Sequence, residues 1–183
     1  MFHYICRDLL DALKYLPFAT GAGALCFCAL TVWDVRRKKE RKESVPVVPV
    51  TLFVTYLAVI MAITLFSREH GSRRGMDLEL FATWGINDRN NAFVIENILL
   101  FVPYGIVCPL AFWHIRSFPS CLAMGALTSF LVELIQLCTG RGYFQIDDIL
   151  TNILGTVAGY LLYFLFWGIR RRRAEKEKKK GRR

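Results

Sequence analysis

Five long apolar runs alternate with short polar or basic segments along the chain. The runs cover roughly residues 15–33, 45–66, 93–113, 118–139 and 149–169. Each has about 20 residues, and a helix of that length spans the hydrocarbon core of a bilayer, which is roughly 30 Å thick. The pattern predicts an all-α, polytopic membrane protein with about five transmembrane helices.

The basic residues predict the orientation of these helices. Six Lys or Arg residues lie between positions 36 and 42, and ten lie between positions 170 and 183. By the positive-inside rule, the 35–44 loop and the 170–183 tail are both cytoplasmic. An odd number of spans agrees with this placement. The N-terminus, the 67–91 loop and the 140–148 loop are then external, as expected of a multi-pass membrane protein.

The amino-acid composition argues against several classes of protein and of binding site. Apolar residues make up 54% of the 183 residues and charged residues 21%, which excludes a disordered chain. The six cysteines form no CxxC pair, so we expect buried, inert thiols and no metal or cofactor. The net charge is +9. Its basic clusters flank apolar runs without a nucleic-acid-binding signature, so we expect the tail to fix topology or contact anionic lipid.

The external 67–91 loop contains hydrophobic residues among its polar ones. Met76, Leu78, Leu80, Phe81 and Trp84 are the apolar positions. Two interpretations remain open: a short interfacial or re-entrant helix with Trp84 at the level of the lipid headgroups, or an ordinary surface loop.

Five polar residues interrupt the last three runs, where they are costly. They are Glu96, Asn97, Glu133, Gln136 and Asn152. A charged side chain near the middle of a transmembrane helix costs about 2.5–3.5 kcal/mol. The expected topology places all five in the external half of the membrane. Glu133 is the deepest, about 10 Å below Gly140 at ~1.5 Å per residue, and therefore has the strongest need for a partner.

Helical spacing places several of these residues on shared faces. Glu133 and Gln136 are three positions apart and face the same way. Asp148, Asn152, Gly155 and Gly159 form one stripe on the fifth helix, and Gly155 and Gly159 make a GxxxG pattern that permits close helix packing. In the third run, Pro103 and Gly105 flank Tyr104, and Pro103 is expected to kink the helix.

The loop between the fourth and fifth runs supplies further polar groups. Arg141 lies between two glycines, above Glu133 and beside Asp147 and Asp148. Its guanidinium suits a bidentate bond to a carboxylate or contact with an anionic headgroup. Each polar residue also has a structural interpretation, such as a helix cap, an interhelical hydrogen bond or a salt bridge. The candidate binding residues are Glu96, Asn97, Glu133, Gln136, Arg141, Asp147, Asp148 and Asn152.

These residues resemble the VanZ-like family of bacterial membrane proteins over about 97–160. The matching elements are an N-x-L-x-F-x-P-x-G segment from Asn97 to Gly105, followed by E-x-x-Q, G-R, D-D and N-x-x-G in order. The chain departs from the family at Leu80-Phe81, where many members have proline before phenylalanine. The length of the chain fits a single domain over 1–183. The resemblance implies a place in the envelope of a Gram-positive bacterium, as a multi-pass protein of the bacterial plasma membrane. It also implies a link to glycopeptide and teicoplanin resistance.

Three functions remain open on this basis. The external polar site could bind a lipid or a lipid-linked cell-wall precursor without chemistry. It could instead catalyse a reaction on a lipid-linked phosphate, although no nucleophile–base pair is visible because His3, His70 and His114 are scattered. A lipid translocator is the third possibility. Five spans are few for such a protein, so a homo-oligomer would be needed.

Overall fold

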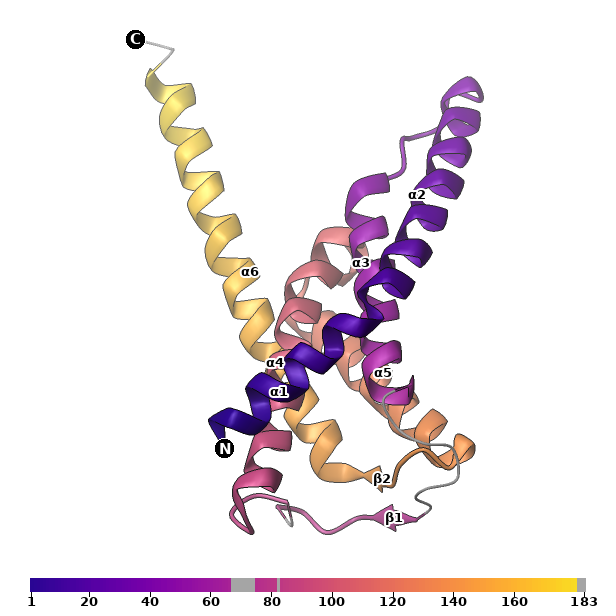
Figure 1. The fold of residues 1–183 in the computed structure, drawn as a ribbon. Coiled ribbons are helices and arrows are strands. Elements are labelled where there is room, and N and C mark those ends of the chain that lie inside the picture. Colours follow the sequence, from indigo (N-terminus) through magenta and orange to yellow (C-terminus); the bar gives the residue numbers. More distant parts are fainter. Residues whose placement is uncertain (67–74, 82, 181–183) are drawn as a thin grey trace.

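The computed structural model describes residues 1–66, 75–81 and 83–180 of the chain. Figure 1 shows an elongated bundle of helices with two very short strands at one end. The elements, in chain order, are α1 (Phe2–Ala12), η1 (Leu13–Tyr15), α2 (Leu16–Lys39), α3 (Val47–Met61), η2 (Ala62–Phe66), β1 (Met76–Asp77), α4 (Asp88–Ala111), η3 (Trp113–Ile115), α5 (Phe118–Thr139), β2 (Phe144–Gln145) and α6 (Ile146–Lys180).

The protein is a multi-pass membrane protein, as the sequence predicts. Five helical segments of the described chain are long and apolar enough to span a membrane. They are Phe2–Lys39, Val47–Leu65, Asp88–Ala111, Phe118–Thr139 and Ile146–Trp167. The two basic segments lie at the same end of the bundle, and both strands lie at the other (Figure 1). We name these the basic end and the loop end; the assignment of the basic end to the cytoplasm stays a prediction.

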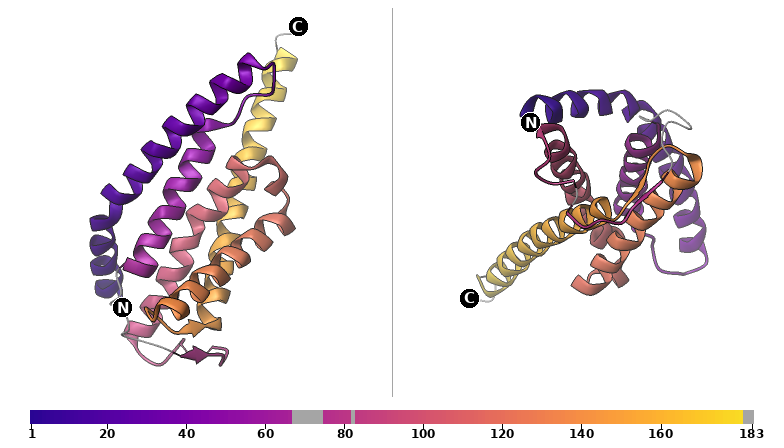
Figure 2. Two further views of the ribbon diagram at one scale, coloured as in Figure 1. Left: turned by 90° about the vertical axis from the view of Figure 1, so that its right-hand side faces the viewer. Right: turned by 90° about the horizontal axis from the view of Figure 1, so that it is seen from below.

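Helix α1 is absent from the sequence-based prediction, which began the first helix at residue 15. Figure 2 shows α1 running across the bundle near the loop end, at a steep angle to the other helices. Its polar side binds α4: the guanidinium of Arg89 lies 2.7 Å from the Asp8 carboxylate and covers the ring of Phe93. Phe2, Leu9 and Leu10 on its other side are exposed. Such a two-sided helix is typical of a membrane interface.

Close contact between α4 and α6 forms the centre of the bundle. A Cβ atom added at Gly105 of α4 would collide with the backbone of Thr156 in α6. One added at Gly155 or Gly159 would collide with the backbone of α4. The two helices therefore touch through main-chain atoms, as the GxxxG pattern allows. The fully buried Phe101 and Tyr104 fill the space toward α3 and α5.

The cysteines only partly match the expectation of buried thiols. Cys108 and Cys121 are fully buried, whereas Cys28 and Cys138 are exposed. Both exposed thiols lie on membrane-spanning helices, on the outer surface of the bundle. Their exposure therefore follows from the lipid-facing surface of the bundle, which an apolar sequence run does not distinguish from its core.

Residues 88–91 of the predicted 67–91 loop belong to α4, and the described part of the loop before them is not a helix. Residues 75–81 and 83–87 contain strand β1 and turns, and residues 67–74 and 82 lie outside the described part of the chain. Strand β1 pairs in parallel with β2, so that Met76 lies opposite Phe144 and Asp77 opposite Gln145. This pairing joins the loop before α4 to the loop before α6. The surface-loop interpretation is therefore the better one for these residues.

The α4–α6 contact yields a stability prediction. Gly159→Ala places a methyl group against the α4 backbone, which cannot move aside as a side chain can. Such overpacking typically destabilises a protein by about 1–3 kcal/mol. Thermal or denaturant unfolding of the purified protein in detergent should show this loss.

Gly21→Ala is the matched control for this experiment. Gly21 also lies in a membrane-spanning helix, but a Cβ added there meets nothing within 4 Å. Alanine favours helix more than glycine does, so this variant should be as stable as the wild type or slightly more stable. Equal stability of the two alanine variants would contradict the close packing of α4 and α6.

Candidate functional site

Six of the eight predicted polar residues gather at the loop end, and all of these except the half-buried Arg141 are buried. Glu133 and Gln136 are only 2% and 1% exposed. Asp147, Asp148 and Asn152 of α6 are buried as well. Glu133 and Gln136 lie near the end of α5, and the two aspartates lie in the first turn of α6. We name the set Glu133, Gln136, Arg141, Asp147, Asp148 and Asn152 the polar cluster.

Asp147 holds the loop that precedes α4. One carboxylate oxygen accepts a hydrogen bond from the backbone N–H of Phe81 at 2.7 Å, and the other accepts one from Thr83 at 3.0 Å. The backbone of Phe81 is in the left-handed region, with φ of 63°. This conformation is unfavourable for a non-glycine residue and needs support from its surroundings. Asp147 supplies that support in addition to complementing the dipole of α6.

Glu133, which the sequence places deepest among the polar residues, has a hydrogen-bond partner in the main chain. Its carboxylate accepts a hydrogen bond from the backbone N–H of Gln145 at 3.0 Å. Gln145 belongs to β2, so the bond fixes the short strand against α5. A buried carboxylate that accepts a main-chain hydrogen bond offsets part of its desolvation cost. Glu133 therefore organises the loop before α6 as Asp147 organises the loop before α4.

Gln136 and Arg141 bind the C-terminal end of the second membrane-spanning helix. The Gln136 amide donates to the carbonyl oxygen of Thr64 at 3.1 Å, and Arg141 Nη1 donates to that of Leu65 at 2.9 Å. The last carbonyl groups of a helix have no partner within the helix, so side-chain donors are needed there.

The turn after α5 places Arg141 in this position. Gly140 ends the helix with a left-handed φ of 64°, and the backbone N–H of Arg141 donates to the carbonyl of Gln136 at 2.9 Å. This is a common way for a helix to terminate at glycine. Gly140, one of the two glycines that flank Arg141 in the sequence, therefore makes the tight turn that sets the position of Arg141.

Asn152 joins α6 to α5 and keeps one group without a partner. Its amide nitrogen donates to the Ser129 hydroxyl at 2.8 Å. Its side-chain oxygen Oδ1 is buried, and no hydrogen-bond donor from the described residues reaches it. A buried acceptor without a donor is uncommon in folded proteins and is a natural position for a water molecule or a ligand group.

Two candidate residues lie on α4 rather than in the polar cluster. Glu96 is half-buried, and its charged neighbours are Asp8, Arg89 and Arg7 at the junction of α1 and α4. One of its carboxylate oxygens is buried without a hydrogen bond from the described residues. Asn97 is also half-buried. The sequence placed both residues in one site with Glu133, but it could not reveal that α1 lies beside Glu96.

An apolar groove of about 160 Å³ lies beside the polar cluster. Its walls come from α4, α6 and the loop that Asp147 holds. The lining residues are Phe81, Trp84, Val94, Ile98, Asp147, Leu150, Thr151 and Leu154. Sequence reasoning identified Phe81 and Trp84 as hydrophobic loop residues but did not place them over α6. The groove and the polar cluster together offer an apolar surface next to polar groups, which suits an amphipathic ligand.

Comparisons with known proteins agree with this arrangement. The sequence model of the VanZ/LLP1 family matches residues 53–167, which include α4, α5, the polar cluster and the groove. Protein VanZ of Enterococcus faecium is 27% identical over 121 residues, covering 62% of this chain and 72% of that protein. No solved structure matches the chain. Because the family match covers more than half of the sequence, the chain belongs to the VanZ/LLP1 family.

Proposed function

We propose that this protein binds a lipid or a lipid-linked cell-wall precursor at its loop end, and that this binding alters the response of the cell envelope to glycopeptides such as teicoplanin. The observation that carries the proposal is the apolar groove of about 160 Å³ beside the polar cluster. The proposed location is the plasma membrane of a bacterium, with the loop end facing outward. The similarity to VanZ of Enterococcus faecium supports a Gram-positive setting.

The shape of the groove favours an amphipathic ligand. Six of its eight lining residues are apolar, whereas Asp147 and Thr151 are polar. The groove thus suits a hydrocarbon chain, with polar groups of the ligand lying toward the loop end. The side-chain oxygen Oδ1 of Asn152, which has no hydrogen-bond donor among the described residues, adds a buried acceptor in the polar cluster.

The hydrogen bonds of the polar cluster determine how this function must be tested. Glu133 and Asp147 fix backbone segments, so their substitution will change the loops as well as any bound ligand. Gln136 and Arg141 similarly support the end of the second span. A substitution in the groove wall that leaves these bonds intact is therefore the more informative test.

Leu154→Trp should abolish the effect of the protein on teicoplanin susceptibility. Leu154 lies in the groove wall and is 56% exposed, so the larger indole ring would fill the groove without disturbing the core. We expect the wild type to raise the minimum inhibitory concentration of teicoplanin in a susceptible Gram-positive host. Cells expressing Leu154→Trp at the same membrane level should match cells without the protein.

The matched control is Leu161→Trp. Leu161 is on the same helix, is 57% exposed and does not line the groove. It should retain the activity of the wild type. Loss of activity in both variants, or in neither, would contradict a function in the groove. Glu133→Gln, Arg141→Ala and Asp148→Asn in the same assay would show whether the polar cluster is also required.

Direct binding provides a second prediction. The purified protein in lipid nanodiscs should bind a polyprenyl-linked cell-wall precursor, and Leu154→Trp should weaken the affinity by about tenfold, or about 1.4 kcal/mol. Native mass spectrometry can measure the bound fraction and detect any change in the mass of the precursor. Equal binding by wild type and Leu154→Trp would exclude the groove. A changed precursor mass would instead support the enzymatic alternative.

A further inference from the structure

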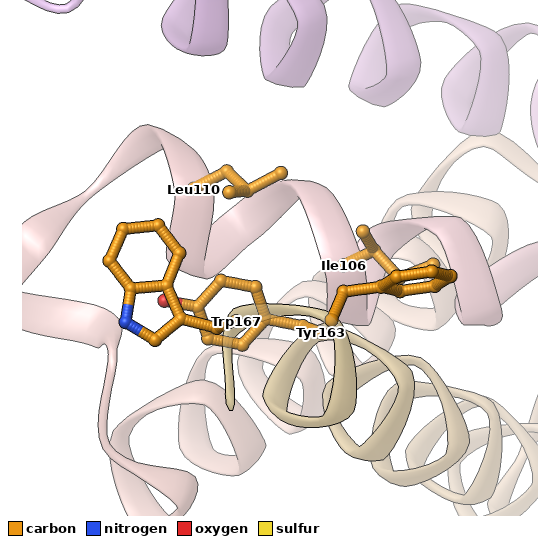
Figure 3. A pocket seen from close by; sticks show the side chains of 5 residues that line it. Ile106, Leu110, Tyr163 and Trp167 are labelled. Atoms are coloured by element: carbon orange, nitrogen blue, oxygen red, sulfur yellow. The ribbon is translucent and has the colours of Figure 1, made fainter. Parts of the chain in front are cut away.

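A second apolar cavity lies nearer the basic end, between α4 and α6. Its volume is about 330 Å³, and its lining residues are Ile106, Leu110, Tyr163, Phe166 and Trp167. Figure 3 shows Ile106 and Leu110 reaching from α4 toward the aromatic rings of Tyr163 and Trp167 on α6. Helix α4 ends at Ala111, whereas α6 continues away from the bundle (Figure 1). No residue of this cavity lines the groove at the loop end.

A cationic side chain lies at the edge of this cavity. The guanidinium carbon of Arg116, in the loop between η3 and α5, is 5.5 Å from the centre of the Trp167 ring. Arg116 Nε donates to the carbonyl of Pro109 at 3.4 Å, and the Tyr160 hydroxyl donates to the carbonyl of Arg116 at 2.9 Å. Contacts with α4 and α6 thus hold Arg116 in place. The residue remains exposed, so its guanidinium is accessible to a ligand.

The sequence of α6 adds positive charge on the same side. Positions 170–173 are all arginine, and the helical backbone continues through them. The first of these arginines comes three positions after Trp167, the last lining residue of the cavity. Basic segments beside a membrane attract anionic headgroups, so the sequence favours anionic lipid at the basic end.

We propose that this cavity is a binding site for an anionic phospholipid of the leaflet at the basic end. One acyl chain occupies the space between Ile106, Leu110 and Tyr163, and the lipid phosphate is bound by Arg116. The charge complementarity selects an anionic lipid over a zwitterionic one. The Trp167 ring lies between the headgroup region and the acyl chain, as tryptophan commonly does at a membrane interface.

Tryptophan fluorescence provides the test. The chain contains four tryptophans, at positions 33, 84, 113 and 167. A variant that keeps only Trp167 would be reconstituted in phosphatidylcholine vesicles containing a minor fraction of brominated phosphatidylglycerol or brominated phosphatidylcholine. Bromine quenches only nearby indole rings. We expect the apparent affinity for the quenching lipid to be about fivefold higher for phosphatidylglycerol, the preference expected from one basic residue near the surface.

A Trp33-only variant is the matched control. The Arg37 guanidinium lies 5.3 Å from the Trp33 ring, so the same cation–aromatic pair occurs in α2, away from the cavity. This variant should show a much smaller preference for phosphatidylglycerol. An equal preference at Trp33 and Trp167 would mean that basic segments attract anionic lipid generally, and it would overturn the proposal. Equal quenching of Trp167 by both lipids would also overturn it.

Two substitutions in the Trp167-only background separate the headgroup from the acyl chain. Arg116→Ala should remove the preference for phosphatidylglycerol. Ile106→Phe should reduce it by filling the cavity while keeping every charge. If Ile106→Phe kept the full preference, the lipid would be bound at the surface and the cavity would not hold its chain. If Arg116→Ala kept it, Arg116 would not bind the phosphate. Either result would overturn the proposed site.

Discussion

The need to satisfy backbone polar groups in a membrane shapes the loop end of this protein. An unpaired backbone N–H or carbonyl group that is buried away from water is costly, so protein groups must supply the hydrogen bonds that a buried loop lacks. Side chains of the polar cluster supply them: Glu133 and Asp147 accept from backbone N–H groups, and Gln136 and Arg141 donate to backbone carbonyls. The polar residues that the sequence marks as a candidate site thus also hold the backbone segments around the apolar groove.

Much of the fold is predictable because it depends on local patterns. Five apolar runs predicted five spans, and the spacing of Gly155 and Gly159 indicated a helix contact of the kind that α4 and α6 make. Helix α1 was missed because it is short and its apolar residues alternate with charged ones, so that it forms no long apolar run. The β1–β2 pairing was missed because residues 76 and 144 are distant in the sequence and only two residues of each strand pair.

The candidate site was only partly predictable for a similar reason. Residue type and depth identified Glu133 and Gln136 as residues that need partners, and the loop sequence added Asp147 as a candidate. Their actual partners are main-chain groups of Gln145, Thr64, Phe81 and Thr83, and main-chain groups carry no sequence signal. Glu96 was grouped with these residues by its depth, although its charged neighbours belong to the α1–α4 junction. The groove also requires Phe81 and Trp84 to fold over α6, which depends on the loop.

The different distances between partners along the chain have a consequence for synthesis. Glu133 and Gln145 are only 12 residues apart in the sequence, so the hydrogen bond between them can form soon after α5 has left the ribosome. Phe81 and Thr83, whose N–H groups bind Asp147, precede it in the sequence by 66 and 64 residues. Two complete helices, α4 and α5, are made in that interval. The loop before α4 therefore cannot reach its final form until the first turn of the last helix has been made, and the groove, which this loop helps to form, cannot be complete earlier.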